Sequence, residues 1–406
     1  MRRSWLVSCL INFFIASLMG LLLRLIYIYP VLGINYQFLL HGHSHVAMLG
    51  WVYLMLYGLI IHFFIPKEAQ QKPVYNRLFW ITQFSVVGMM FRFPFEGYAL
   101  FSIAFSTLHI FCSYYFCRLV WKDARSESLP EQKMLKTALV FMLLSTLGVW
   151  CLGPAVGMLG KASNFYQIAI QFFLHFQFNG WFLFAVLALF FKQIKVKLNK
   201  KQFQLFYKLL VTGTILMLAL PVSWYIPNLI FNLINGIGVL LQFAAFWIFI
   251  QMIRPHFRPF FDSLKNIEKI VYGFALFSLT LKIILQLAVL VPELAQISHQ
   301  IRNWVIGFIH LTMLGIITGF LFAFILQNQF LNKKSMLVRL GIILFLIGYT
   351  LTELLLFGQG LFQYFTKAEI PNYYNYLFFI SCCLPVGFFL ILLSSIRSNS
   401  GYKFMH

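Results

Sequence analysis

The sequence predicts an all-α integral membrane protein with about twelve transmembrane helices. Apolar residues make up 61% of the 406 residues and charged residues only 10%, whereas soluble domains carry about 25% charged residues. The alternating ten-residue strands of a membrane barrel are absent, so helices are the expected spanning elements. Apolar windows long enough to cross a bilayer fall at 5–28, 44–65, 78–95, 98–120, 134–158, 165–191, 205–225, 228–252, 268–292, 303–327, 335–357 and 374–396.

The basic residues predict the orientation of these spans. Of the 31 Lys and Arg residues, 24 fall in segments that share one side of the membrane, and basic loops are typical of the cytoplasmic side. These segments are 67–77, 118–136, 192–201, 254–269, 333–339 and the two ends of the chain. We therefore expect both termini to be cytoplasmic in a multi-pass protein of the bacterial inner (cytoplasmic) membrane. The net charge of +21 then reflects topology and attraction to anionic lipid, which excludes a nucleic-acid partner.

The chain is predicted to form a single transmembrane domain over residues 1–406. The longest polar stretch, Lys122 to Lys136, reads as a linker between two spans. The first apolar run reaches Leu23 without a small-residue cleavage site, so we expect an uncleaved first span. The six cysteines all lie in apolar runs without metal-finger spacing, which indicates neither a disulfide framework nor a zinc site.

A histidine followed five residues later by a glycine occurs three times. The pairs are His45 with Gly50, His175 with Gly180, and His310 with Gly315. Ten histidines and 25 glycines in 406 positions would give about 0.6 such pairs by chance. The pairs lie in spans 2, 6 and 10, four spans apart, which is the pattern of an internal repeat. We expect three pseudo-symmetric four-helix modules, at about 1–125, 126–262 and 263–406.

Imidazole at membrane depth is costly unless it faces the bundle interior, so these histidines are functional candidates. The neutral ring offers a lone pair that suits iron or copper, and a low-spin haem takes two axial ligands from helices at matching depth. Gly50 and Gly315 would remove bulk where a flat macrocycle, or a neighbouring helix, comes close. The alternative is that the histidines pack against backbone carbonyls and the glycines serve helix contacts.

Span 2 opens with the sequence His41-Gly42-His43-Ser44-His45. On a helix, His41 and His45 share a face, while His43 points almost oppositely. One of these rings is expected to bind haem, with His45 the first choice and His43 the second, while His41 is a candidate ligand for a second metal. The alternative is a solvated histidine-rich loop.

Other polar residues at membrane depth are fewer. Lys282 and Glu353 are expected to face the interior, where they would serve a proton path or bind one another. Arg302 and Arg92 are candidate partners for haem propionates, the alternative being ordinary interfacial anchors. His109 is expected to be a packing residue. No role is assigned to His62, His256, His299 and His406.

Twelve spans with histidines in spans 2, 6 and 10 resemble the catalytic subunit of the haem–copper oxidase superfamily (cytochrome c oxidase subunit I-like). The resemblance implies a low-spin haem ligated by His45 (or His43) and His310, and a copper or non-haem iron ligand at His175. The run from His43-Ser44-His45 to Gly50-Trp51 is also similar to NnrS-type haem- and copper-containing proteins of nitric oxide response.

The chain departs from the superfamily in two places. Span 7, from Gln204 to Trp224, holds no histidine where the superfamily has a copper-binding pair, and span 10 has Phe308 where a second histidine would bind the second haem. An oxygen or nitric oxide reductase with a complete copper site is therefore not expected.

The leading hypothesis is a haem b protein of electron transfer or of nitric oxide or redox response. A cytochrome or quinol donor and small accessory subunits are its expected partners. The first alternative is a metal-ion or small-solute transporter that captures its substrate with the histidines of span 2. The second is a structural or assembly subunit without a cofactor.

Overall fold

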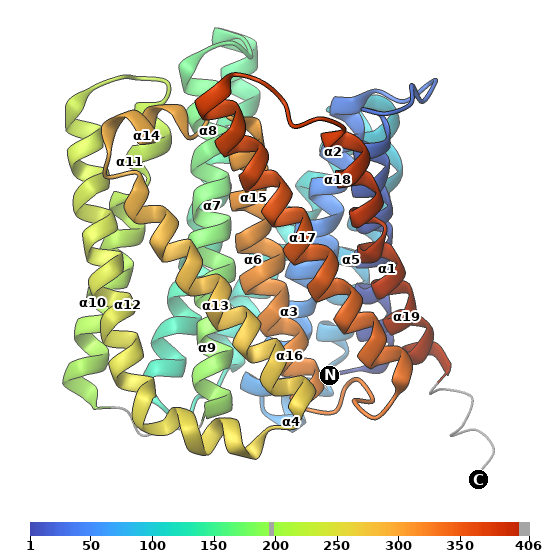
Figure 1. Ribbon diagram of the computed structural model, residues 1–406. Coiled ribbons are helices and arrows are strands. Elements are labelled where there is room, and N and C mark those ends of the chain that lie inside the picture. The colour runs from blue at the N-terminus through green and yellow to red at the C-terminus, as the bar shows by residue number, and fades with distance from the viewer. Residues whose placement is uncertain (195–198, 398–406) are drawn as a thin grey trace. The chain divides into compact units, whose positions relative to one another are not determined.

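The computed structural model describes residues 1–194 and 199–397 (Figure 1). Within these residues every regular element is a helix, and twelve helices are long and apolar enough to cross a membrane. The prediction of an all-helical chain with twelve spans is confirmed. The orientation of the spans and the three modules stay predictions. Four residues used or named in the sequence analysis, Lys195, Lys197, Lys403 and His406, lie outside the described residues.

The spans follow one another along the chain. They are formed by α1 (Arg3–Leu25); α2 (Tyr36–His45), η1 (Val46–Tyr53) and α3 (Leu54–Phe64); α5 (Pro73–Glu96); α6 (Leu100–Asp123); α7 (Leu129–Leu159); α8 (Asn164–His175), η2 (Phe176–Phe182) and α9 (Leu183–Ile194); α10 (Lys200–Leu216) and α11 (Ala219–Ser223); α12 (Leu229–Ser263); α13 (Asn266–Ala288); α15 (Arg302–His310), η3 (Leu311–Thr318) and α16 (Gly319–Gln327); α17 (Met336–Thr366); and α18 (Tyr373–Ser381) and α19 (Cys383–Arg397). Two short helices, α4 (Lys67–Gln70) and α14 (Pro292–Ile297), lie between spans.

Two spans are interrupted within the turn that precedes a proline. The seventh span breaks at Met217, four residues before Pro221, and the twelfth breaks at Cys382, three residues before Pro385. A proline ring clashes with the carbonyl four residues earlier and lacks the N–H that would bond to it, which favours an interruption at both positions.

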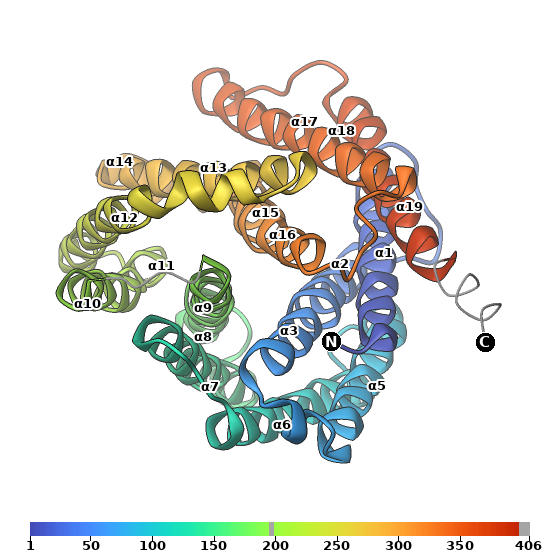
Figure 2. The same ribbon diagram turned by 90° about the horizontal axis from the view of Figure 1, so that it is seen from below.

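The chain divides into two compact units. Unit 1 contains residues 1–125 and the chain from Leu321 onward, and unit 2 contains Ser126–Phe320. In unit 1, α1 packs against α19 and η1, and α19 also packs against α17 (Figure 2). In unit 2, α10 packs against α12, and α7 packs against α8 and α9 (Figure 1). Aromatic rings fill both cores, with Phe13 stacked on Trp51 at 4.3 Å in unit 1 and Phe190 beside Phe320 at 5.3 Å in unit 2.

Spans 2, 6 and 10 are the most buried of the twelve. In their most apolar windows, 83%, 67% and 83% of the residues are buried, against 33–50% in the other nine spans. These three spans carry the repeated histidines, so the histidines belong to helices that expose little surface to lipid.

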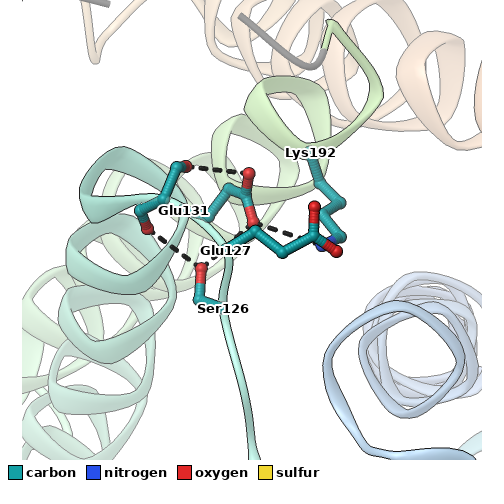
Figure 3. Close-up of polar contacts among 5 residues, drawn as sticks. Ser126, Glu127, Glu131 and Lys192 are labelled. Carbon is teal, nitrogen blue, oxygen red and sulfur yellow. Dashed lines mark hydrogen bonds and ion pairs between the residues drawn. The ribbon is translucent and has the colours of Figure 1, made fainter. Parts of the chain in front are cut away.

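A polar cluster fixes the start of α7 to the end of α9 within unit 2 (Figure 3). The Glu131 carboxylate, whose side chain is 5% exposed, accepts hydrogen bonds from the hydroxyls of Ser126 (3.0 Å) and Ser128 (2.8 Å). The ammonium of Lys192 lies 3.5 Å from Glu131 and 2.9 Å from Glu127, whose side chain is 83% exposed. Glu131 therefore has its negative charge satisfied at the helix N-terminus, where negative charge is stabilising.

Replacing Glu131 with glutamine is expected to lower the free energy of unfolding by about 1–3 kcal/mol, because a buried carboxylate with three partners is lost. Glu127→Gln is the matched control, since it touches the same Lys192 from an exposed position where ion pairs contribute little. Reversible unfolding of the purified protein in mixed detergent micelles measures both. Equal losses for the two variants would contradict the assignment.

Candidate functional site

Each of the three repeated histidines is the last residue of an α-helical segment and is followed at once by a π-helical segment. His45 precedes η1, His175 precedes η2 and His310 precedes η3. The glycine of each pair lies inside its π segment. Fewer than 1% of residues in proteins are π-helical, and such segments are frequent at functional sites. The sequence repeat is therefore also a repeat of an uncommon backbone geometry.

The ring of His45 is held in one tautomer by its own helix. Its Nδ1 lies 2.8 Å from the carbonyl oxygen of His41. A carbonyl only accepts hydrogen bonds, so Nδ1 carries the proton and the lone pair of the neutral ring is on Nε2. The ring stacks on Phe93 at a centroid distance of 4.2 Å. This arrangement, with one ring nitrogen bonded to a carbonyl and the other presenting a lone pair, is the one that metal-binding histidines adopt.

The histidine-rich opening of span 2 is helical rather than a loop. His41 lies on the same side as His45, with its ring 4.7 Å from that of Tyr98. His43 faces α1 instead, where its Nδ1 lies 2.8 Å from the carbonyl oxygen of Ala16. The three rings are therefore divided between two faces, as the helical spacing predicts.

Gly50 allows two helices to approach η1 closely. A Cβ at this position would lie 2.9 Å from Val86 of α5 and 3.1 Å from Asn12 of α1. Gly180 has the same role against α7, where a Cβ would lie 2.7 Å from Phe141. Gly315 is buried within η3. At the first two glycines, a neighbouring helix fills the space beside the π segment.

A buried amide pair supports the first π segment. Asn12, which is 1% exposed, donates from Nδ2 to the carbonyl of Gly50 (2.9 Å) and to Oε1 of Gln83 (2.8 Å). Gln83 donates in return to Oδ1 of Asn12 at 3.0 Å. These two residues were not among the predicted site residues, although an Asn and a Gln inside apolar windows are the signal that could have found them.

His175 is held in the other tautomer. Its Nε2 lies 2.7 Å from the carbonyl oxygen of Thr214, so its lone pair is on Nδ1. The hydroxyl of Thr214 accepts a hydrogen bond from Nε2 of Gln242 at 3.1 Å. Lys282 of α13 interacts electrostatically with His175, and its ammonium lies 5.8 Å from the ring centroid of Phe308. All of these residues belong to unit 2.

The remaining predicted site residues lie at helix ends or in the interior. His310 ends α15 in unit 2, and Arg302 begins the same helix at an exposed position. Arg92 lies 3.9 Å from Glu96 and covers the ring of Phe101 at 4.6 Å. The structure thus brings His175 together with Lys282, and His45 together with His41.

Within unit 1, the buried Glu353 has Arg24 as an electrostatic partner. Arg24 was not among the predicted site residues. His109 is 3% exposed and packs edge-on against the ring of Tyr53 at 4.6 Å.

His299 lies between α14 and α15, outside the spans. Its ring stacks on Trp224 at a centroid distance of 5.1 Å. Burial lowers the pKa of His299 below its usual value, so the ring is neutral at pH 7.

No model of a known protein family matches the chain, and no curated protein matches it in sequence.

Proposed function

We propose that this chain is a haem b protein of the bacterial inner membrane, with His45 and His310 as the axial ligands, that acts in electron transfer or in a nitric oxide or redox response. The observation that carries the proposal is the π segment that follows each repeated histidine in the three most buried spans. A π segment is a poorer helical geometry, so its recurrence at three matching positions favours a function over packing alone.

The local geometry of His45 supports its role as a ligand. A haem, when bound, supplies reversible one-electron transfer, and the protein supplies binding and orientation. The carbonyl of His41 holds the Nδ1 proton of His45, which fixes the ring and makes its Nε2 a better base. Phe93 covers one face of the ring and restricts its rotation. His43, the second choice, has the same tautomer but faces α1.

The same repeat also supports the proposed arrangement of the helices. The recurrence of the His–π–Gly pattern in spans 2, 6 and 10 supports three four-helix modules. The distribution of basic residues supports cytoplasmic termini. Arg302 is the proposed partner of a haem propionate because it begins α15, the helix that His310 ends. A cytochrome or a quinol is the proposed electron donor.

Copper does not fit the donors around His175. Among the described residues, no group of three or more His, Cys, Asp or Glu side chains is placed to hold a metal ion. Nε2 of His175 donates its proton to the carbonyl oxygen of Thr214. The charged neighbour of the ring is the cationic Lys282, which would repel a second cation. We therefore propose no copper-dependent step.

Optical spectra of the purified protein, oxidised and reduced, test the proposal. We expect a Soret band, split α and β bands on reduction, and a pyridine haemochrome of the b type at about one haem per chain. Folded protein that shows no Soret band after expression with sufficient haem would contradict it. Metal uptake by such haem-free protein would instead support the transporter hypothesis.

A further inference from the structure

Phe308 and His310 project from nearly opposite sides of α15. The two residues are separated by two positions in an α-helical segment, which places their side chains about 200° apart around the axis. The ammonium of Lys282 lies over the ring of Phe308. Lys282 therefore lies on the face of α15 that is turned away from His310, the proposed haem ligand.

Lys282 is a buried cation without a hydrogen-bond acceptor. It is 1% exposed, and its Nζ has no hydrogen-bond partner among the described residues. The ring of Phe308 offers a cation–π contact, which satisfies none of the three N–H donors. Gln286, which lies one turn further along α13, is also buried and is 6% exposed. A buried ammonium in this position is costly unless an acceptor of opposite charge reaches it.

His175 is close enough to Lys282 for the two side chains to interact electrostatically. The Nε2 proton of His175 is bonded to Thr214, and the lone pair on its Nδ1 makes no hydrogen bond to Nζ of Lys282. The N–H donors of Lys282 are therefore without an acceptor among the described residues. A small ligand with acceptor atoms and a negative charge would satisfy these donors and stabilise the protonated amine.

We propose that Lys282, His175 and Phe308 form a second site, distinct from the haem ligand His310, which binds a small inorganic anion through the Lys282 ammonium. The positive charge that binds the anion thus comes from Lys282. It lies near His175, where the resemblance to haem–copper oxidases implies a metal ion. This site does not depend on the proposed function, because none of its three residues is an axial haem ligand.

Azide is a suitable probe because its antisymmetric stretching band in the infrared shifts when the anion leaves water. We expect saturable azide binding to the purified full-length protein. Lys282→Met should weaken it about tenfold or more, because charge-assisted hydrogen bonds are lost. This variant is expected to fold, since an apolar side chain of similar length replaces a buried charge; if it does not, Lys282→Gln takes its place.

Lys208→Met is the matched control, because it removes the charge of an exposed lysine in α10. It should keep azide binding within about threefold. Absence of saturable binding in the wild type, equal affinity in Lys282→Met or Lys282→Gln, an equal loss in Lys208→Met, or a shift of the Soret band on addition of azide, which would place the anion on a haem iron, would each overturn the proposal. The haem spectrum, recorded on the same samples, reports separately on the proposed function.

Discussion

Replacing His45 with alanine is expected to remove nearly all low-spin haem from the purified protein, and replacing His310 should have the same effect. A six-coordinate haem with two imidazoles loses this state when either ligand is removed. For His45 the loss is expected to be large, because its ring is already fixed by the carbonyl of His41 and by Phe93. Haem per chain and the Soret spectrum measure the effect.

Two controls make this result specific. His43→Ala should retain the spectrum, because its ring is bonded to the carbonyl of Ala16 on the other face of α2. His256→Ala, near the end of α12, should also retain it. Added imidazole should restore low-spin haem in His45→Ala. If His45→Ala keeps an unchanged spectrum while His43→Ala loses it, the ligand is His43.

The second large effect is expected on stability, from Asn12→Leu. Asn12 donates to the Gly50 carbonyl and exchanges two hydrogen bonds with Gln83. Leucine would leave the Gln83 amide and the Gly50 carbonyl without these partners in the interior of unit 1. Each buried polar group that loses its partner costs about 1–3 kcal/mol, so we expect a loss of about 2–5 kcal/mol in the free energy of unfolding. Unfolding in mixed micelles measures it.

A double-mutant cycle with Gln83→Leu distinguishes the contribution of the Asn12–Gln83 hydrogen bonds to stability from that of side-chain packing. The double variant should lose less than the sum of the two single variants, because it leaves only the Gly50 carbonyl without its partner. Additive losses, or an Asn12→Leu variant as stable as the wild type, would show that the amide pair does not support η1.

The twelve spans were predictable from the sequence because lipid restricts the choice of structure. A spanning segment satisfies its backbone only as a helix or within a barrel, and a window of about 20 apolar residues marks it. The ends were less predictable. Helices α12 and α17 continue to Ser263 and Thr366, beyond the predicted ends at 252 and 357, since helical hydrogen bonds do not stop where the apolar composition does.

The candidate site was predictable only in part. The spacing of histidine and glycine was found from the sequence, and it led to the three most buried spans. The π segments were not predicted, because this geometry depends on contacts between helices, such as the bond from Asn12 to the carbonyl of Gly50. Nor did spacing indicate that Lys282 lies over Phe308, since the two residues come from different spans.

The most direct test of the account is the near-infrared magnetic circular dichroism spectrum of the oxidised wild-type protein, which reports the two axial ligands of a low-spin haem. The account predicts the charge-transfer band of a haem with two imidazole ligands, and its absence from both His45→Ala and His310→Ala. A band that indicates one imidazole with a different second ligand, or a high-spin haem in the wild type, would contradict it.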